Sequence, residues 1–258
     1  MLVSVIMPTY NCGRFIAQSV ESVIAQTISD WELCIVDDCS RDDTSEVLKP
    51  YLEKYPNIHY TVLKENGGPA VARTEALRQA TGKYVAFLDS DDLWLPEKLE
   101  KQIAFMEEKN VLFSCTAYRH MDEEGNLLDE VRVPPAKTDY NKMLYLANPI
   151  GNLTVMYNRE VLGAYEVPLI KKRNDFALWL RILRDAPCCV GMPEVLGHYR
   201  LRQNSVTTSS SKWQLLQYHW TLYRVHEKLP VWKCALAVAT CLAVKITKFG
   251  WSKNGQQM

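Results

Sequence analysis

The chain has 258 residues, 47% of them hydrophobic, and its 30 lysines and arginines are balanced by 30 aspartates and glutamates. This length and apolar content suffice for one packed domain with an appendage, and the zero formal net charge argues against a nucleic-acid binder that relies on phosphate contacts. The eight cysteines include no Cys-x-x-Cys pair. We therefore predict neither a zinc site nor a disulfide framework, but reduced thiols in a cytosolic protein.

Neither a leader nor a membrane span is predicted. The first residues, MLVSVIMPTYN, lack the basic start and the small-residue cleavage site of a signal peptide. No segment reaches the roughly 18–20 apolar residues that a spanning helix needs. The nearest candidate, 234–244, is short and is bracketed by Lys233 and Lys245.

Strand and helix patterns alternate through the first 100 residues. Short apolar runs rich in β-branched residues predict strands, and apolar residues at helical spacing predict helices between them. This alternation favours a doubly wound, mostly parallel sheet flanked by helices. No Gly-x-Gly-x-x-Gly follows the first strand, so an NAD or FAD enzyme is disfavoured. The predicted strands are 2–7, 31–36, 58–63 and 84–88, and the predicted helices are 15–24, 46–55 and 70–80.

The second half of the chain is less regular. Its patterns predict two helices, three strands, a hairpin turn and a loop, followed by a helical and basic C-terminal segment. The helices are 96–109 and 176–183, the strands 111–118, 155–157 and 194–202, the turn 121–126, the loop 131–139 and the C-terminal segment 211–258.

Three carboxylates, Asp89, Asp91 and Asp92, follow the fourth predicted strand within four positions. Ligands of open α/β sheets gather at the carboxyl ends of strands, and crowded carboxylates are often relieved by a divalent cation. The alternative is that Asp92 only caps the next helix. An EF-hand is excluded, because Trp94 occupies the position of the required glycine.

Four motifs, each at the end of a predicted strand, closely resemble those of family 2 glycosyltransferases. The resemblance is close over residues 2–100 and looser to about Ser205. It implies the GT-A fold, a nucleotide-sugar donor and inversion at the anomeric carbon. The motifs are VSVIMPTYN at 3–11, IVDDCS at 35–40, NGG at 66–68 with Arg73, and DSDD at 89–92.

The resemblance assigns the donor site to the first half of the chain. Thr9, Tyr10 and Asp37, with Pro8 beside them, match the positions that hold the uridine, and Asp38 adjoins them. For Asp38 the alternative is a cap on the next turn. Arg73 matches an arginine near the nucleotide, with a surface helix arginine as the alternative. Asp89 and Asp91 match the family's Asp-x-Asp, with Asp91 the direct ligand of Mn²⁺ or Mg²⁺ and Asp89 nearer the ribose or a metal-bound water.

Asp175 matches the family's catalytic base, which takes the proton of the acceptor hydroxyl. The residue before it is Asn174, where many relatives carry Glu or Gln. The alternative is a simple helix cap. Near the end of the resemblance, Arg200 lies where relatives carry basic residues over the diphosphate.

The resemblance predicts a hexosyltransferase that moves one sugar from a UDP-sugar to a polyprenyl-diphosphate-linked saccharide in bacterial O-antigen or capsule synthesis. A single transfer is expected because the Gln-x-x-Arg-Trp motif of processive synthases is absent. Residues 1–100 would form the nucleotide-binding half and 101–210 the acceptor half. The alternative is a non-catalytic sugar-nucleotide-binding or scaffold protein on the same fold; a nucleotidyltransferase is disfavoured because no glycine- and lysine-rich signature follows the first strand.

The basic, tryptophan-bearing segment 211–258 has two interpretations. It either packs on the domain as ordinary helices or lies on the inner face of the cell membrane, where aromatic and lysine side chains meet anionic headgroups. The second interpretation suits an enzyme with a lipid-linked acceptor. It predicts a peripheral protein of the cytoplasmic membrane.

Overall fold

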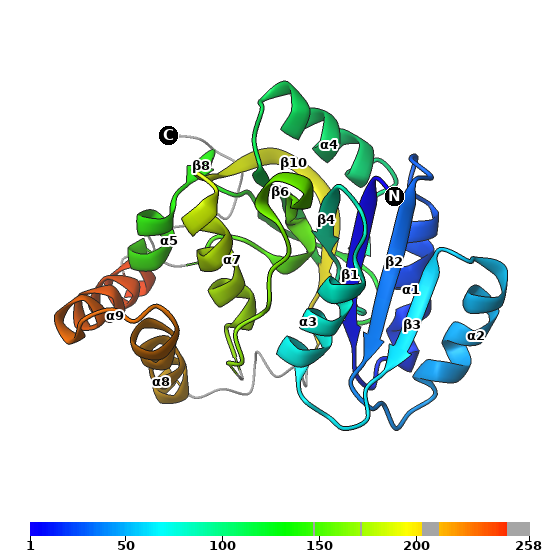
Figure 1. The fold of residues 1–258 in the computed structure, drawn as a ribbon, viewed down its shortest axis with the longest axis horizontal. Helices are drawn as coiled ribbons and strands as arrows, with labels where there is room; N and C mark the ends of the chain where they lie inside the picture. The colour runs from blue at the N-terminus through cyan, green and yellow to red at the C-terminus, as the bar shows by residue number, and fades with distance from the viewer. Residues whose placement is uncertain (147, 171, 203–211, 247–258) are drawn as a thin grey trace.

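The computed structural model describes residues 1–146, 148–170, 172–202 and 212–246, without the side chains of 212–216 and 241–246. It is an α/β fold with a central ten-stranded sheet (Figure 1). The strands are β1 (Val3–Thr9), β2 (Trp31–Asp37), β3 (Ile58–Val62), β4 (Tyr84–Phe87), β5 (Leu93–Trp94), β6 (Phe113–Met121), β7 (Leu127–Arg132), β8 (Lys137–Thr138), β9 (Met156–Asn158) and β10 (Cys189–Arg200). The α-helices are α1 (Gly13–Ile24), α2 (Thr44–Lys54), α3 (Pro69–Gln79), α4 (Lys98–Glu108), α5 (Tyr140–Leu146), α6 (Arg159–Leu162), α7 (Asn174–Asp185), α8 (Lys212–Thr221) and α9 (Val231–Ile246). A 3₁₀ turn, η1 (Asn152–Thr154), and a π-helical turn, η2 (Leu222–His226), complete the elements.

The sheet has the order β3-β2-β1-β4-β9-β6-β10-β5, with β7 paired to β6 and β8 to β10. Six strands, β1, β2, β3, β4, β6 and β10, run in one direction, because β9 is antiparallel to both β4 and β6. The carboxyl ends of these six strands therefore meet at one edge of the sheet. This confirms the predicted, mostly parallel sheet.

The central strands are buried on both faces, as their unbroken apolar runs predicted. Every residue of β1, β2 and β4 is buried. Strand β1 extends two residues past its predicted end, through Pro8 and Thr9, which pair with Val36 and Asp37. Pro8 is tolerated because the pairing with β4 stops at Ile6, so the missing N–H removes no bond on that side.

Helices cover both faces of the sheet. Apolar residues of α3 and α7 form one core with alternate residues of the strands. Those of α1, α2 and α4 form the second core on the opposite face. The alternation of side chains along each strand divides the two sets, so Ile6 joins the first core while Val5 and Met7 join the second.

Two predictions for the second half need correction. The loop predicted at 131–139 contains the end of β7 and the short strand β8, because the hairpin partner of β6 continues to Arg132. The late strand starts at Cys189 rather than at 194. Its register shifts between Met192 and Val195, around Pro193, and this irregularity hides the strand's first half from a periodicity argument.

The described part of the C-terminal segment consists of α8, η2 and α9 with a short connection at 227–230, so it is mainly helical, as predicted. The inner side of α9 packs against α5, with Cys234 and Ala237 buried in the first core. Figure 1 shows α8 and α9 beside α5 at one end of the molecule. Among the described residues no helix is both long enough and apolar enough to span a bilayer.

Lys98, at the start of α4, is a buried lysine whose Nζ has no hydrogen-bond partner among the described residues. Its Nζ lies 4.1 Å from the centre of the Trp94 ring. Burial lowers the pKa of Lys98 well below its usual value. The unfolded chain therefore binds this proton more readily, so the lysine costs stability as the pH falls below the unfolded pKa.

We expect Lys98→Met to raise the free energy of unfolding by about 1–3 kcal/mol at neutral pH. The gain should be larger at pH 6 than at pH 9, because acid favours the unfolded, protonated lysine. Thermal melts at the two pH values measure it. Lys101→Met on the same helix, an exposed lysine paired with Glu194, is the matched control and should change little. A destabilised Lys98→Met at both pH values would contradict this account.

Candidate active site at the carboxyl edge of the sheet

The predicted site residues of the first half meet at the carboxyl edge of the sheet, because they follow strands that run in parallel. Thr9 ends β1, Asp37 ends β2, and Asp89 comes two residues after β4. Strand β9 runs in the opposite direction, so the turn η1 before it also lies at this edge. The segment that ends β10 reaches the same place from the other side of β4.

Asp89 is held by two side chains from outside its own turn. Its Oδ1 accepts hydrogen bonds from Arg73 Nη2 at 2.9 Å and from Asn152 Nδ2 at 2.8 Å. Its Oδ2 makes no hydrogen bond to a residue that the structure describes. One oxygen thus fixes the carboxylate, and the other is unpaired among the described residues.

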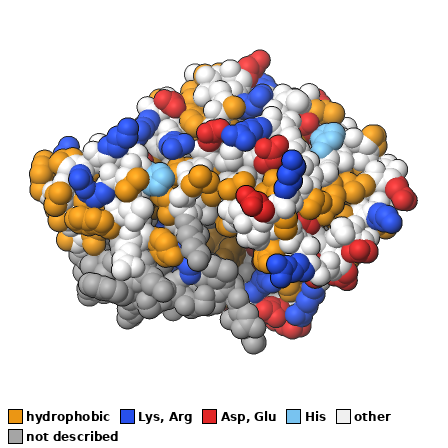
Figure 2. Space-filling view, turned by 60° about the horizontal axis from the view of Figure 1, so that its bottom comes forward, with side chains coloured by type: hydrophobic (Ala, Val, Ile, Leu, Met, Phe, Trp, Pro, Cys, Tyr) orange, Lys and Arg blue, Asp and Glu red, His pale blue; other side chains and the backbone are white. Residues whose placement is uncertain are grey.

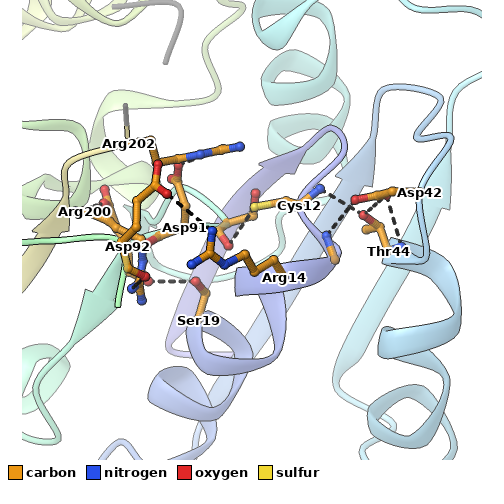
Figure 3. Close-up of polar contacts among 12 residues, drawn as sticks. Cys12, Arg14, Ser19, Asp42, Thr44, Asp91, Asp92, Arg200 and Arg202 are labelled. Carbon is orange, nitrogen blue, oxygen red and sulfur yellow. Dashed lines mark hydrogen bonds and ion pairs between the residues drawn. The ribbon is translucent and has the colours of Figure 1, made fainter. Parts of the chain in front are cut away.

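Asp91 forms an ion pair with Arg202, whose Nη1 lies 3.2 Å from Asp91 Oδ2 (Figure 3). Burial and the charge of Asp89 raise the pKa of Asp91, and Arg202 opposes this shift. The Arg202 side chain is one-third exposed and lies over the Phe15 ring. Arg202 is therefore a cation at the rim of the acidic turn, able to exchange Asp91 for another anion.

Asp92 has a structural role. It is 1% exposed, and its Oδ1 accepts the backbone N–H of Arg200 at 2.9 Å. Burial, with the charges of Asp91 and Asp89, raises its pKa well above the usual range. The interpretation of Asp92 as the cap of the next helix is wrong, because that position is taken by Glu97.

Arg200 lies in the protein interior. Its guanidinium donates to the carbonyls of Asp91 and Glu123, at 2.8 and 2.9 Å, and to Gln18 Oε1 at 2.6 Å. It also lies over the Phe15 ring and is 3% exposed. These contacts brace the acidic turn against α1 and the hairpin after β6. Figure 3 shows Arg200 beside Asp91 and Asp92. These interactions leave Arg202, two residues later, as the arginine at the surface of the site.

The carboxylates of Asp37 and Asp38 bind different groups. Asp37 Oδ2 accepts the Tyr60 hydroxyl at 2.6 Å, and its Oδ1 accepts the Ser40 N–H at 2.8 Å. Both oxygens of Asp38 accept backbone N–H groups of the Gly67-Gly68 turn, at 2.7 and 2.8 Å. Asp38 thus ties the end of β2 to the loop before α3. The alternative, a cap on the next turn, is wrong for Asp38, because the Ser40 N–H in that turn is bound by Asp37 instead.

Thr9 and Tyr10, the two polar residues of the first motif that were predicted to hold the uridine, differ in exposure. The Thr9 hydroxyl is buried without a hydrogen-bond partner among the described residues, whereas Tyr10 is about half exposed. Pro8 is buried in the strand. Of the residues in this motif that were predicted to hold the uridine, Tyr10 is the one that faces solvent at the edge.

Arg73 connects the acidic turn to the helix that carries the predicted base. It is buried, and its Nη1 donates to Asn174 Oδ1 at 2.6 Å while its Nη2 binds Asp89. Asn174 begins α7, and Asp175 follows in the first turn. The Asp175 carboxylate is partly exposed and has no hydrogen bond or ion pair with a described residue.

The backbone before this helix is strained. Arg173 precedes α7 in the left-handed region, with φ 68°. A bulky residue adopts this conformation only where the surroundings enforce it. The strained residue Arg173 and the hydrogen bond from Arg73 to Asn174 together fix the start of α7, and therefore the position of Asp175 in its first turn.

Asp89 and Asp91 fit the donor set of a hard divalent cation that binds together with a diphosphate. Their side chains are 31% and 24% exposed. Within the described ranges, no three His, Cys, Asp or Glu side chains gather closely enough to hold a metal ion by themselves. Mg²⁺ is typically bound by one or two carboxylates plus substrate phosphates, so a pair of carboxylates fits an ion that arrives with a nucleotide.

The mostly parallel sheet, with acidic residues at or just after the ends of β2 and β4, has the architecture that the resemblance to GT-A glycosyltransferases implies. Residues 4–165 match the family model described as glycosyl transferase family 2. The chain belongs to this family of glycosyltransferases, as its four motifs predicted.

Two relatives cover most of the chain. The putative teichuronic acid biosynthesis glycosyltransferase TuaG of Bacillus subtilis is 45% identical over 228 residues, which are 88% of this chain and 89% of TuaG. The Escherichia coli UDP-Glc:alpha-D-GlcNAc-diphosphoundecaprenol beta-1,3-glucosyltransferase WfgD is 37% identical over 220 residues, 85% of this chain and 84% of WfgD.

Solved structures confirm the fold. Residues 1–349 of TarS from S. aureus, in complex with UDP-GlcNAc, align with a TM-score of 0.71 at 22% identity, over 96% of this chain and 73% of that chain. The mannosyltransferase PcManGT from Pyrobaculum calidifontis, in complex with GDP-Man and Mn²⁺, aligns with a TM-score of 0.59 at 20% identity, over 95% and 75% of the two chains.

Two residues of the site were not predicted from the sequence. Asn152 carried no signal, because it lies in an irregular stretch outside every motif. Tyr60 looked like one more apolar residue of a strand, yet it orients Asp37. Contacts between residues so far apart in the chain are visible only once the strands are assembled.

Proposed function

We propose that this glycosyltransferase is metal-dependent and inverting, and that it moves one hexose, glucose, galactose or an N-acetyl form, from a UDP-sugar to a polyprenyl-diphosphate-linked saccharide in bacterial surface polysaccharide synthesis. The observation that carries the proposal is the bridge from Asp89 through Arg73 and Asn174 to the helix of Asp175. It joins a donor carboxylate to a free carboxylate on a separate element. Transfer between two substrates requires both.

The donor would occupy the edge between the ends of β1, β2 and β4. Tyr10 offers an exposed ring at this edge, and Asp37 a carboxylate held by Tyr60. Asp89 and Asp91 would hold Mn²⁺ or Mg²⁺ against the diphosphate. When bound, the ion supplies positive charge for the leaving UDP. Arg202 would add a charge-assisted hydrogen bond to the same phosphates.

Asp175 would act as the general base. Its carboxylate is partly exposed and has no partner among the described residues, so it is free to accept the proton of an acceptor hydroxyl. Arg73 would be a positioning residue rather than a nucleotide ligand, because its guanidinium is buried between Asp89 and Asn174. Residues 1–100 would then form the nucleotide-binding half and 101–210 the acceptor half.

The relatives support the substrate classes. WfgD is named for transfer from UDP-Glc to GlcNAc-diphosphoundecaprenol, and TuaG for teichuronic acid biosynthesis. We therefore infer a lipid-linked acceptor here. A decisive assay incubates the protein with Mn²⁺, radiolabelled UDP-sugars and a GlcNAc-diphospho-alkyl acceptor. Formation of labelled lipid product that EDTA abolishes would support the proposal. Transfer that EDTA does not affect would show that the reaction does not depend on a metal ion.

The outer side of α9 supports a peripheral position on the inner face of the cell membrane. Val231, Trp232 and Leu236 lie exposed on it, at 57%, 64% and 48%. Figure 2 shows hydrophobic side chains gathered with lysines and arginines at the end of the molecule where Figure 1 places α9. An apolar helix face next to cations suits a surface of anionic lipids.

We expect the double substitution Trp232→Glu with Leu236→Glu to weaken binding to phosphatidylglycerol-containing vesicles by at least about tenfold, since each large apolar side chain contributes about 1.5–3 kcal/mol when buried. Vesicle cosedimentation measures it. Val161→Glu, at an equally exposed position on α6, is the matched control. Unchanged binding of the double variant would exclude α9 as the membrane contact. Point substitutions are preferable to truncation at Pro230, because truncation also uncovers the side of α5 on which α9 packs.

A further inference from the structure

A cavity lies next to the turn that holds Asp89, on the side of β4 away from Asp37. It measures about 300 Å³. It lies between the carboxyl end of β6, the neighbouring strand β7 and the loop that precedes η1. Its volume is at the lower end of the range for small-molecule sites. Its lining residues are Tyr118, His120, Arg132, Asn148 and 149–151.

The cavity is directly linked to the reacting edge. Gly151 lines it, and the next residue, Asn152, donates the hydrogen bond to Asp89. Gly151 packs closely on Tyr118: a Cβ at this position would lie 2.9 Å from the Tyr118 ring. One turn of the chain thus forms a wall of the cavity and holds the carboxylate that the proposed function assigns to the donor.

The chemistry of the lining suits an uncharged, polar ligand. Arg132, its one permanent cation among the described lining residues, forms an ion pair with Glu130. His120 Nδ1 lies 3.1 Å from the same carboxylate, and burial lowers the pKa of His120, which keeps the ring neutral at pH 7. A phosphate would find little uncompensated positive charge here. Hydroxyl groups would find an aromatic wall, amide and imidazole groups, and backbone polar groups.

Asn148 provides an available donor. Its Oδ1 accepts the N–H of Ile150 at 3.0 Å, which shapes the loop, while its Nδ2 makes no hydrogen bond to a described residue. The Tyr118 hydroxyl donates no hydrogen bond to a described residue either, and burial raises the pKa of Tyr118 to about 12. Both groups are thus available to a ligand hydroxyl.

A larger cavity at the other end of α7 does not compete for this role. It measures about 520 Å³ and is lined by Arg181, Arg184, Asp185, 226–228 and Tyr165. Arg181 and Arg184 lie toward the far end of α7 from Asp175, roughly 9–14 Å along the helix at 1.5 Å per residue. A hydroxyl bound there would not reach the base.

We propose that the cavity lined by Tyr118, Asn148 and Gly151 binds the terminal sugar ring of the acceptor saccharide and that the Gly151-Asn152 turn sets its distance from Asp89. This inference rests on the proposed glycosyl transfer. It assigns the acceptor sugar to β6, β7 and the loop before η1, and it makes Asn148 and Tyr118 specificity-determining residues.

Asn148→Asp tests the proposal without dismantling the loop, since aspartate retains the oxygen that accepts the Ile150 N–H and loses only the amide donor. Tyr118→Phe removes only the hydroxyl. Each variant should raise the acceptor KM, or weaken calorimetric binding of a GlcNAc-diphospho-alkyl probe in the presence of UDP, by about tenfold or more. UDP affinity and the melting temperature should not change. Arg181→Ala, in the other cavity, is the control and should keep the acceptor KM.

Acceptor binding equal to that of the wild type in both variants would overturn the proposal. So would a wild-type protein that binds UDP but neither this probe nor methyl glycosides of glucose, galactose or N-acetylglucosamine. A wild-type protein that binds no UDP would instead count against the proposed function itself, so the two failures are distinguishable.

Discussion

Asp175→Asn is expected to lower turnover by about 10²–10⁴-fold while UDP binding stays unchanged. Asparagine has nearly the same shape but cannot take a proton from the acceptor hydroxyl. Because Asp175 makes no hydrogen bond to a described residue, the substitution breaks no contact within the described structure. Transfer assays under saturating donor, with calorimetry of UDP in parallel, separate the two effects.

The matched control for this variant is Asp185→Asn. Asp185 ends the same helix and accepts a hydrogen bond from the Tyr165 hydroxyl at 2.8 Å, so it tests a carboxylate of α7 away from the reacting edge. We expect it to retain turnover within about twofold, as a typical surface substitution does. If Asp175→Asn were as active as this control, another group would have to be the base. The proposed role of Arg73 in positioning Asp175 would then be contradicted as well.

Asp91→Asn is expected to remove the increase in UDP affinity that Mn²⁺ produces. Asparagine keeps the volume of the side chain but loses the negative charge that a hard cation requires. The variant also releases Arg202 from its ion pair, so weak UDP binding that is independent of metal should persist. Calorimetric titration of UDP with Mn²⁺ and then with EDTA measures both parts.

Its neighbour provides the control. Asp92 is fully buried and accepts the Arg200 N–H, an interaction that asparagine can also make. Asp92→Asn should therefore keep the metal dependence of UDP binding. An Asp91→Asn protein in which Mn²⁺ still strengthens UDP binding would show that this carboxylate is not a ligand and would transfer the assignment to Asp89 alone.

Much of the donor side could be predicted from the sequence. The apolar runs of β1, β2 and β4 are continuous because these strands are buried on both faces, and parallel strands must bring their carboxyl ends to one edge. The sequence alone therefore places Asp37, Asp89 and Asp91 at the same edge of the sheet. The family followed from motifs that occupy these same strand ends.

The roles of individual polar groups were decided by tertiary structure. Arg73 and Arg200 read from the sequence as cations for a nucleotide. In the folded protein both are buried, one between Asp89 and Asn174 and the other beneath the acidic turn. A motif specifies that an arginine is present but not which residues it contacts, because those residues can be remote in the sequence. Gln18, for example, accepts a hydrogen bond from Arg200 although 182 positions separate them.

The sequence by itself determined the class of fold, the acidic edge and most of α7, which was predicted at 176–183 and spans Asn174–Asp185, since local periodicity and strand direction suffice for these. Only the tertiary structure placed the antiparallel strand β9 between β4 and β6, and with it the turn that brings Asn152 to Asp89 and Gly151 to Tyr118. The physical reason is that a three-residue strand has too little pattern to specify its neighbours. Its place is set by the packing of both cores and by the pairing of its backbone groups with two strands remote in the chain.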